Sequence, residues 1–147
     1  QETRMSFFTC LLIALGGALG TIARYLVSVA TKPISQGIPW GTIGINVSGS
    51  FVIGLFGTLT LANGRFPVSE NTRLFVMIGL CGGYTTFSSF SLQTLDLLRN
   101  GAMLRASVNV IGSVILCVLA VSVGHLIAAQ LNGHAVRIPQ ASIEERG

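Results

Sequence analysis

Charged residues are scarce in this chain. Of its 147 residues, 10% are Asp, Glu, Lys or Arg and 50% are hydrophobic, whereas soluble domains typically carry about 25% charged residues. The nine basic residues are scattered and form no cluster, so the chain lacks the basic patch of a nucleic-acid-binding protein. The shortage of charge favours a protein that is solvated mostly by lipid.

Cysteines are also few, and their positions exclude two further kinds of site. The three cysteines, Cys10, Cys81 and Cys117, all lie in apolar segments. In such surroundings a cysteine is typical of a small packing residue. The sequence therefore predicts neither a disulfide framework nor a cysteine metal site.

What the chain has instead is a set of four long apolar segments. They cover approximately residues 7–30, 40–62, 74–98 and 106–131. Each is long enough to cross a bilayer as a helix, which takes about 20 apolar residues. Short polar connections separate them, and a polar tail covers 132–147. The sequence predicts an all-α membrane protein with four transmembrane helices in a single transmembrane domain, residues 1–147.

Lysine and arginine are nearly balanced between the two ends of these predicted helices. One end carries Arg4, Arg65, Arg73, Arg137 and Arg146, and the other carries Lys32, Arg99 and Arg105. Two of the first group lie in the distal tail and count for less, so the bias that normally fixes orientation is close to nil. Two interpretations stay open: a weak bias that selects one orientation, or insertion in both orientations with antiparallel pairing.

Polar residues recur at helical spacing inside the apolar segments. Asn46 and Ser50 are spaced i, i+4 in the second segment. Asn109, Ser113 and Cys117 follow the same spacing in the fourth, so each set shares a helix face. Such stripes are typical of hydrogen bonding between membrane helices, and they also suit the wall of an ion path.

Glycines are plentiful, 18 in all, and four of them form pairs at helical spacing. Gly16 and Gly20 lie in the first segment, and Gly79 and Gly83 in the third. Small residues four positions apart let two helix backbones approach closely. The sequence therefore predicts close helix packing at both places.

The third segment contains a polar interruption, GLCGGYTTFSSFS, at 79–91. Its glycine pair, Gly82 and Gly83, allows a helix to unwind, and the hydroxyl groups that follow can bond to a freed backbone. Broken helices at bilayer depth form ion sites in transporters and channels. Freed carbonyls suit a cation, whereas hydroxyl and amide donors suit an anion. Phe87 and Phe90, spaced i, i+3, either pack or offer their positive ring edges to an anion.

Three motifs carry a resemblance to a known family. GGYTTFSSFS at 82–91 resembles the third-helix signature of the Fluc (CrcB) family of fluoride channels. GTIGINVSGSFVIG at 41–54 and GGALGTIARY at 16–25 are similar to the family's second-helix and first-helix motifs. The resemblance implies a fluoride-selective channel that exports fluoride passively across the cytoplasmic (inner) membrane of a bacterium. It further implies a dual-topology, antiparallel homodimer with two pores.

The resemblance also implies roles for individual residues. The residues expected to line the fluoride pores are Phe87, Phe90, Asn46, Ser89, Thr86, Asn109, Ser113 and Cys117. Arg24 is expected at the pore vestibule, although its long side chain could equally reach the membrane interface. The backbone carbonyls of Gly82 and Thr85 are expected to hold a structural Na⁺ at the dimer centre. Hard, neutral oxygen ligands suit sodium better than a transition metal.

The chain departs from the family pattern at four positions. Ser89 stands where threonine is usual, and Tyr84 replaces a common leucine close to the expected sodium site. Cys117 stands where members often have Ser or Thr, and a thiol is a weaker donor than a hydroxyl. Gln93 stands where several members have glutamate.

Other function classes fit the sequence less well. A small four-helix proton-coupled multidrug exporter needs an intramembrane carboxylate. The predicted spans contain no Asp or Glu except Asp96, which lies at the end of the third. A membrane assembly subunit would explain the polar stripes but not the broken-helix motif. An enzyme is not predicted, because His125 and His134 lie at or beyond the end of the fourth segment and no nucleophile–base–acid set is apparent.

Overall fold

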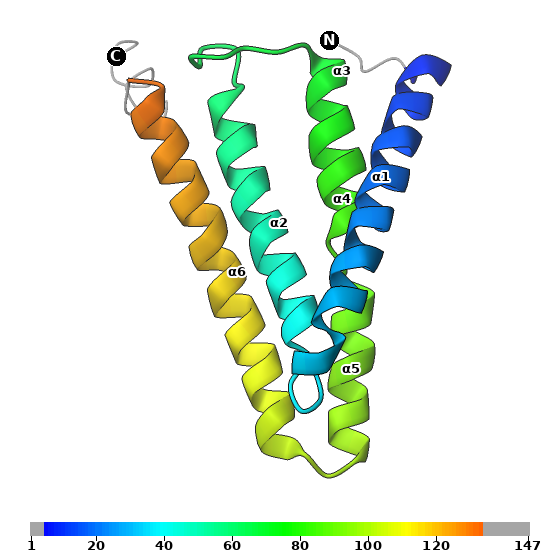
Figure 1. The fold of residues 1–147 in the computed structure, drawn as a ribbon. Coiled ribbons are helices and arrows are strands. Elements are labelled where there is room, and N and C mark those ends of the chain that lie inside the picture. The colour runs from blue at the N-terminus through cyan, green and yellow to red at the C-terminus, as the bar shows by residue number, and fades with distance from the viewer. Residues whose placement is uncertain (1–4, 134–147) are drawn as a thin grey trace, which may run out of the picture.

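Four long helical spans form a V-shaped bundle in the computed structural model (Figure 1), which describes residues 5–133. The spans are α1 (Phe7–Thr31), α2 (Trp40–Leu59), an interrupted third span (Glu70–Arg99) and α6 (Met103–Leu131). The part of the chain described contains no strand, and each span is long and apolar enough to cross a membrane. The predicted helical class and number of spans are therefore confirmed.

The helix ends differ slightly from the predicted ones. The second helix ends at Leu59, earlier than predicted, and the fourth begins at Met103, earlier than predicted. The third span begins at Glu70 because Ser69 caps it, its hydroxyl accepting a hydrogen bond from the Thr72 N–H at 3.2 Å. The tail residues 134–147, which include His134, Arg137 and Arg146, lie outside the described residues, as does Arg4.

The third span is built from four consecutive pieces. They are α3 (Glu70–Arg73), the π-helical η2 (Leu74–Cys81), α4 (Gly82–Tyr84) and α5 (Phe87–Arg99). The chain is extended at Thr85 (φ −75°, ψ 159°) and Thr86 (φ −153°, ψ 109°). The predicted break is thus present, but it lies after the glycine pair: Gly82 and Gly83 are still helical.

The glycines of the third span serve helix packing rather than unwinding. A Cβ added at Gly83 would collide with the backbone of Gly17, and one added at Gly79 would lie 3.0 Å from the Gly16 Cα. On the facing helix, a Cβ at Gly20 would collide with the Leu80 carbonyl. The predicted close packing at the paired glycines is therefore confirmed, whereas the idea that Gly82–Gly83 opens the helix is wrong.

The packing divides the bundle into two helix pairs. α1 packs against η2 and α4, and α2 packs along α6. The second pair also approaches closely at glycines, since a Cβ at Gly54 would meet the Val121 backbone and one at Gly124 the Phe51 backbone. The pairs diverge toward the α3 end and come together where α5 lies against α6 and α2 (Figure 1).

Arg73 connects the two pairs at their divergent end. Its Nη1 donates to the Gly57 carbonyl at 2.9 Å and to Thr60 Oγ1 at 2.7 Å. Gly57 lies in the last turn of α2, where carbonyls lack helical partners and a cation is favourable. The third span is thereby fixed to the end of α2.

The buried interior is small. The buried hydrophobic residues among those described are Ile43, Ile45, Cys81, Ala106 and Ala128, while most large apolar side chains of α1 and α6 are exposed. In water this surface would be unfavourable, but lipid tails solvate it without cost. Small residues at helix contacts and large ones outside are what a bilayer favours.

Substituting Gly83 with alanine should destabilise the protein, because the new methyl group meets the Gly17 backbone. Overpacking of this kind typically costs about 1–3 kcal/mol. The matched control is Gly82→Ala, since the nearest atom to a Cβ at that neighbouring position is 3.9 Å away. Thermal unfolding of both variants in detergent should show a lower midpoint for Gly83→Ala alone. Equal midpoints would contradict the packing role.

Candidate functional site

A side-chain amide from α2 holds the break in the third span. Asn46 Nδ2 donates to the Thr86 carbonyl at 3.1 Å, and the Thr86 N–H donates to Asn46 Oδ1 at 2.8 Å. The amide therefore pairs with both backbone groups of Thr86, as a neighbouring strand would. Thr86 is only 8% exposed, and an unpaired backbone group in such a place is costly. Asn46 fixes the path of the chain between α4 and α5.

Hydroxyl groups complete the backbone pairing around the break. Thr86 is the N-cap of α5: its Oγ1 accepts a hydrogen bond from the Ser89 N–H at 3.2 Å, and its hydroxyl donates to Ser89 Oγ at 3.0 Å. The Thr85 hydroxyl donates to the Cys81 carbonyl at 2.9 Å. The prediction that these hydroxyls bond locally to freed backbone is confirmed for Thr86, whereas the Cys81 carbonyl reached by the Thr85 hydroxyl keeps its helical bond from the Thr85 N–H at 3.0 Å.

Two carbonyls at the break lose the partners that an unbroken helix would give them. The Gly82 carbonyl would accept from the Thr86 N–H, which instead bonds to Asn46. The Thr85 carbonyl would accept from the Ser89 N–H, which instead bonds to Thr86 Oγ1. Gly82 and Thr85 both line a cavity of about 260 Å³ that also contains Asn46. The two residues predicted to bind sodium thus line one cavity, and each has a carbonyl without its helical partner.

Arg24 points to the break rather than to the membrane surface. Its Nε donates to the Gly83 carbonyl at 3.1 Å, and Thr21 Oγ1 donates to the same oxygen at 3.4 Å. In an unbroken helix this carbonyl would accept from the Phe87 N–H. Arg24, Thr86 and Ser89 also line a second cavity of about 260 Å³. The residue predicted for the vestibule and two residues predicted for the pore therefore line one cavity.

Gln93 extends this space toward the α5 end of the bundle. It lies, with Ser28 and Thr42, in the wall of both the Arg24 cavity and a larger one of about 430 Å³ that reaches Lys32 and Asp96. Within residues 5–133, Gln93 Oε1 is the buried side-chain oxygen that has no hydrogen-bond partner. The two cavities therefore share polar wall residues between this end of the bundle and the break.

Phe87 and Phe90 lie side by side at the start of α5. Their ring centroids are 5.3 Å apart and the planes are tilted by 45°. Phe87 is 78% exposed, although it follows directly on the buried break. The structure therefore brings the two rings together and leaves one of them open to whatever lies beside the protomer.

The polar stripe of α6 forms hydrogen bonds to α5. Asn109, which is 1% exposed, donates through Nδ2 to Thr94 Oγ1 at 2.9 Å and lies 3.4 Å from the Ser113 hydroxyl that donates to it. Thr94 in turn donates to the Phe90 carbonyl at 2.8 Å. Thr94 was not among the predicted site residues, although its spacing of four from Phe90 places it on the same helix face. Cys117, half-buried, has no side-chain hydrogen bond among the described residues.

Comparison with known proteins gives a consistent result. A family model described as CrcB-like protein, Camphor Resistance (CrcB), matches residues 11–125. The fluoride-specific ion channel FluC of Methylobacterium radiotolerans is 75% identical over 143 residues, covering 97% of this chain and 100% of that protein. FluC of Gluconobacter oxydans is 72% identical, covering 96% and 99% of the two chains, and FluC of Methylocella silvestris is 60% identical, covering 82% and 92%.

Replacing Asn46 with alanine should loosen the break, because it leaves the Thr86 N–H and carbonyl unpaired. Each unpaired buried group costs about 1–3 kcal/mol. Hydrogen exchange measured by mass spectrometry should become faster in a peptide covering 82–91, and the unfolding midpoint should fall. Ser50→Ala is the control, since Ser50 lines the same cavity one turn further along α2. Unchanged exchange in the Asn46 variant would mean that another contact holds the break.

Proposed function

Because this chain belongs to the CrcB family, we propose that it is a fluoride channel that exports fluoride passively across the cytoplasmic membrane. The observation that carries the proposal is the 75% identity to a named fluoride-specific channel over that protein's whole length. The four apolar spans, together with the family, make the chain a multi-pass membrane protein. A proton-coupled multidrug exporter finds no support in these comparisons.

The chemistry of the break agrees with conduction of a small anion. Fluoride holds its water tightly, so a pore must offer N–H and O–H donors in place of that water. Asn46 and Asn109 each use one amide hydrogen for a protein acceptor, and a carboxamide has two. Each therefore keeps a donor for an ion. The Ser89 and Thr86 hydroxyls in the Arg24 cavity add further polar contacts.

The exposed Phe87 ring points to a pore that a second copy completes. The Phe87 ring is 78% exposed and directly follows Thr86, which lines the Arg24 cavity, so a second protomer could cover it. We assign the pore wall to Phe87 and Phe90 of two copies, with their ring edges toward the ion. Ser113 and Cys117 then continue the path along α6, and Arg24 draws anions toward its entrance.

An antiparallel arrangement of the two copies accounts for the weak charge bias. Loop residues Arg65 and Arg73 lie at one end of the spans, and Lys32, Arg99 and Arg105 lie at the other. A bias this small allows the chain to insert into the membrane in either orientation. Two inverted copies would give two equivalent pores of opposite direction.

A sodium ion at the centre of this dimer would use the carbonyls of Gly82 and Thr85. Both lose their helical partners and line one cavity. Two copies would contribute four neutral oxygens, which is a ligand set for a hard monovalent cation. When bound, the ion would fasten the two broken helices together and add positive charge close to both pores.

Purified protein in liposomes should release fluoride rapidly and chloride hardly at all. Fluoride and chloride electrodes read in parallel would measure both rates, in liposomes prepared without a pH gradient. Protein-free liposomes are the control for leakage. Chloride release as fast as fluoride release, or release only under a pH gradient, would overturn the channel proposal.

A thiol placed at one end of the bundle should be accessible from both faces of the membrane, because the proposed dimer contains copies in both orientations. In a cysteine-free background, Gln36→Cys and Asn63→Cys place single thiols at exposed positions at opposite ends of the bundle. An impermeant maleimide added outside intact cells should label roughly half of the copies of each variant if insertion is unbiased. Labelling of one variant alone would show a single orientation.

A further inference from the structure

A second route approaches the break from the α3 end, where the two helix pairs diverge. Its outer part is a cavity of about 610 Å³ whose wall includes Arg73, Thr58 and His125. Its inner part is the cavity of about 260 Å³ that is lined by Asn46, Gly82 and Thr85. Ile53 and Met77 belong to the walls of both. The two cavities therefore adjoin in one groove between α2 and the third span.

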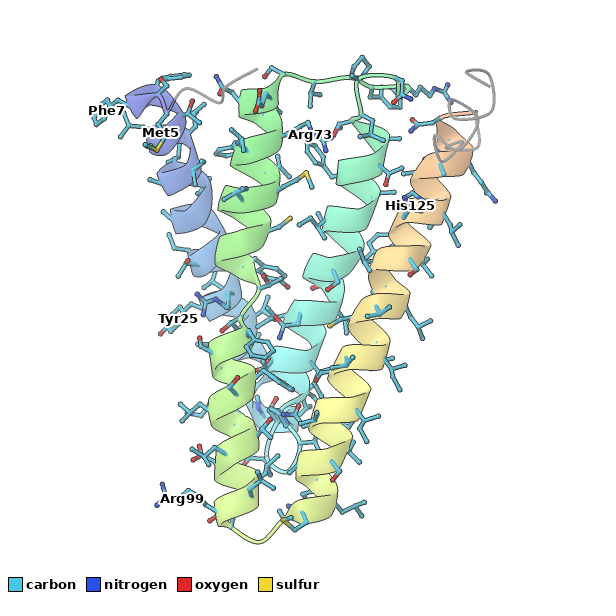
Figure 2. All side chains as sticks on the ribbon, turned by 180° about the vertical axis from the view of Figure 1, so that it is seen from behind. Met5, Phe7, Tyr25, Arg73, Arg99 and His125 are labelled. Carbon is cyan, nitrogen blue, oxygen red and sulfur yellow. The ribbon has the colours of Figure 1, made fainter. Side chains whose placement is uncertain are left out.

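The outer cavity offers two N–H donor groups. Figure 2 shows Arg73 between the third span and α2, and His125 on α6 near the same end of the bundle. Arg73 uses only Nη1 for its contacts with Gly57 and Thr60, so Nε and Nη2 keep their hydrogens free of any described residue. Both side chains lie in the wall of the cavity.

Thr58 is the hydrogen-bond partner of the His125 ring. The Thr58 hydroxyl lies 2.8 Å from His125 Nδ1 and makes no other hydrogen bond with the described residues. The hydroxyl can therefore donate to Nδ1, which leaves the ring hydrogen on Nε2. In that tautomer His125, a residue of the cavity wall, keeps an Nε2–H that can donate.

The charge in the wall at this end of the groove is positive. Arg73 is the charged side chain in the wall, and no carboxylate lines either cavity among the described residues. Glu70, the nearest acidic residue along the chain, is exposed on α3 and is not part of the wall. A cleft with one sign of charge and apolar walls concentrates ions of the opposite sign. The Arg24 cavity, on the other side of the break, also has arginine and no carboxylate among its described wall residues, although its walls are polar.

We propose that Arg73 and His125 form an anion-binding mouth at the α3 end of the groove. This inference rests on the proposed function, so its ligand is fluoride carrying part of its water. The guanidinium and the Nε2–H of His125 would hold the ion, and the small number of contacts lets it leave again, as conduction requires. In an antiparallel dimer, each membrane face would then carry one Arg73–His125 mouth and one Arg24 cavity.

The test compares His125→Leu with His125→Gln in the liposome assay. Leucine removes the donor, whereas glutamine keeps an N–H at a similar reach. Loss of a hydrogen bond to an ion corresponds to about tenfold weaker binding. At low fluoride the leucine variant should therefore release fluoride about tenfold more slowly than the unmodified protein, and the glutamine variant at nearly the unmodified rate. At saturating fluoride the three rates should converge.

A matched control separates this role from general damage to α6. Val123→Leu changes an exposed residue of the same helix that does not line the cavity, and it should leave the rate unchanged at every fluoride concentration. Arg73 is kept in all variants because it also fixes the end of α2. Size-exclusion chromatography of each variant checks that it is folded and assembled.

Each outcome has a distinct meaning. Slower release by the leucine variant at low fluoride alone, with rescue by glutamine, supports the mouth. Equal rates for His125→Leu and the unmodified protein overturn it, and so does an equal loss in both His125 variants at all concentrations, which indicates a structural role. A resonance of His125 Nε2, in ¹⁵N-histidine-labelled protein, that does not move with added fluoride also overturns it. If the unmodified protein releases no fluoride, the proposed function itself fails.

Discussion

A backbone group at bilayer depth has no water to bond with, and this constraint governs the third span. The break at Thr85 and Thr86 frees several N–H and C=O groups at once. Asn46 forms hydrogen bonds with the N–H and the carbonyl of Thr86. The Thr86 side chain accepts from the Ser89 N–H, and Arg24 donates to the Gly83 carbonyl. Side chains from α1, α2 and the third span itself thus replace the missing helical bonds. These backbone groups therefore have hydrogen-bond partners although the helix is interrupted, and for this reason the break can persist in a membrane.

The same capping bonds create the polarity of the site. When Asn46 and Thr86 bond to the N–H groups, the carbonyls of Gly82 and Thr85 lose their helical partners, and both residues line one cavity together with Asn46. Thr86, Ser89 and Gln93 line the other cavity, with Arg24. A single interruption therefore supplies unpaired backbone carbonyls beside one cavity and hydroxyl-bearing residues beside the other. The proposed cation site and the proposed anion path both depend on this interruption.

Hydropathy and spacing were enough to predict four spans, the presence of a break and the close contacts at paired glycines. They could not predict how the break is held, because the partners come from distant parts of the chain. Asn46 lies forty positions from Thr86, and Arg24 is bonded to a carbonyl fifty-nine positions away. The prediction that Gly82 and Gly83 open the helix was wrong for a related reason. The flexibility of glycine can be read from the local sequence, whereas the α1 backbone that packs against Gly83 comes from a distant part of the chain. The π-helical turns of η2 have no sequence signature at all.

A site held by hydrogen bonds that are already formed suits passive conduction better than a transport cycle. An exporter must alternate between two arrangements, and each capping bond at the break would have to be broken and remade. In a channel the donors stay in place and the ion moves past them. The charges are arranged in the same sense: Arg24 on one side and Arg73 on the other flank the break, and each is fixed to a backbone carbonyl. In the proposed channel, two cations held in this way would attract anions toward the break from both ends, while their bonds to backbone carbonyls would keep their side chains in place.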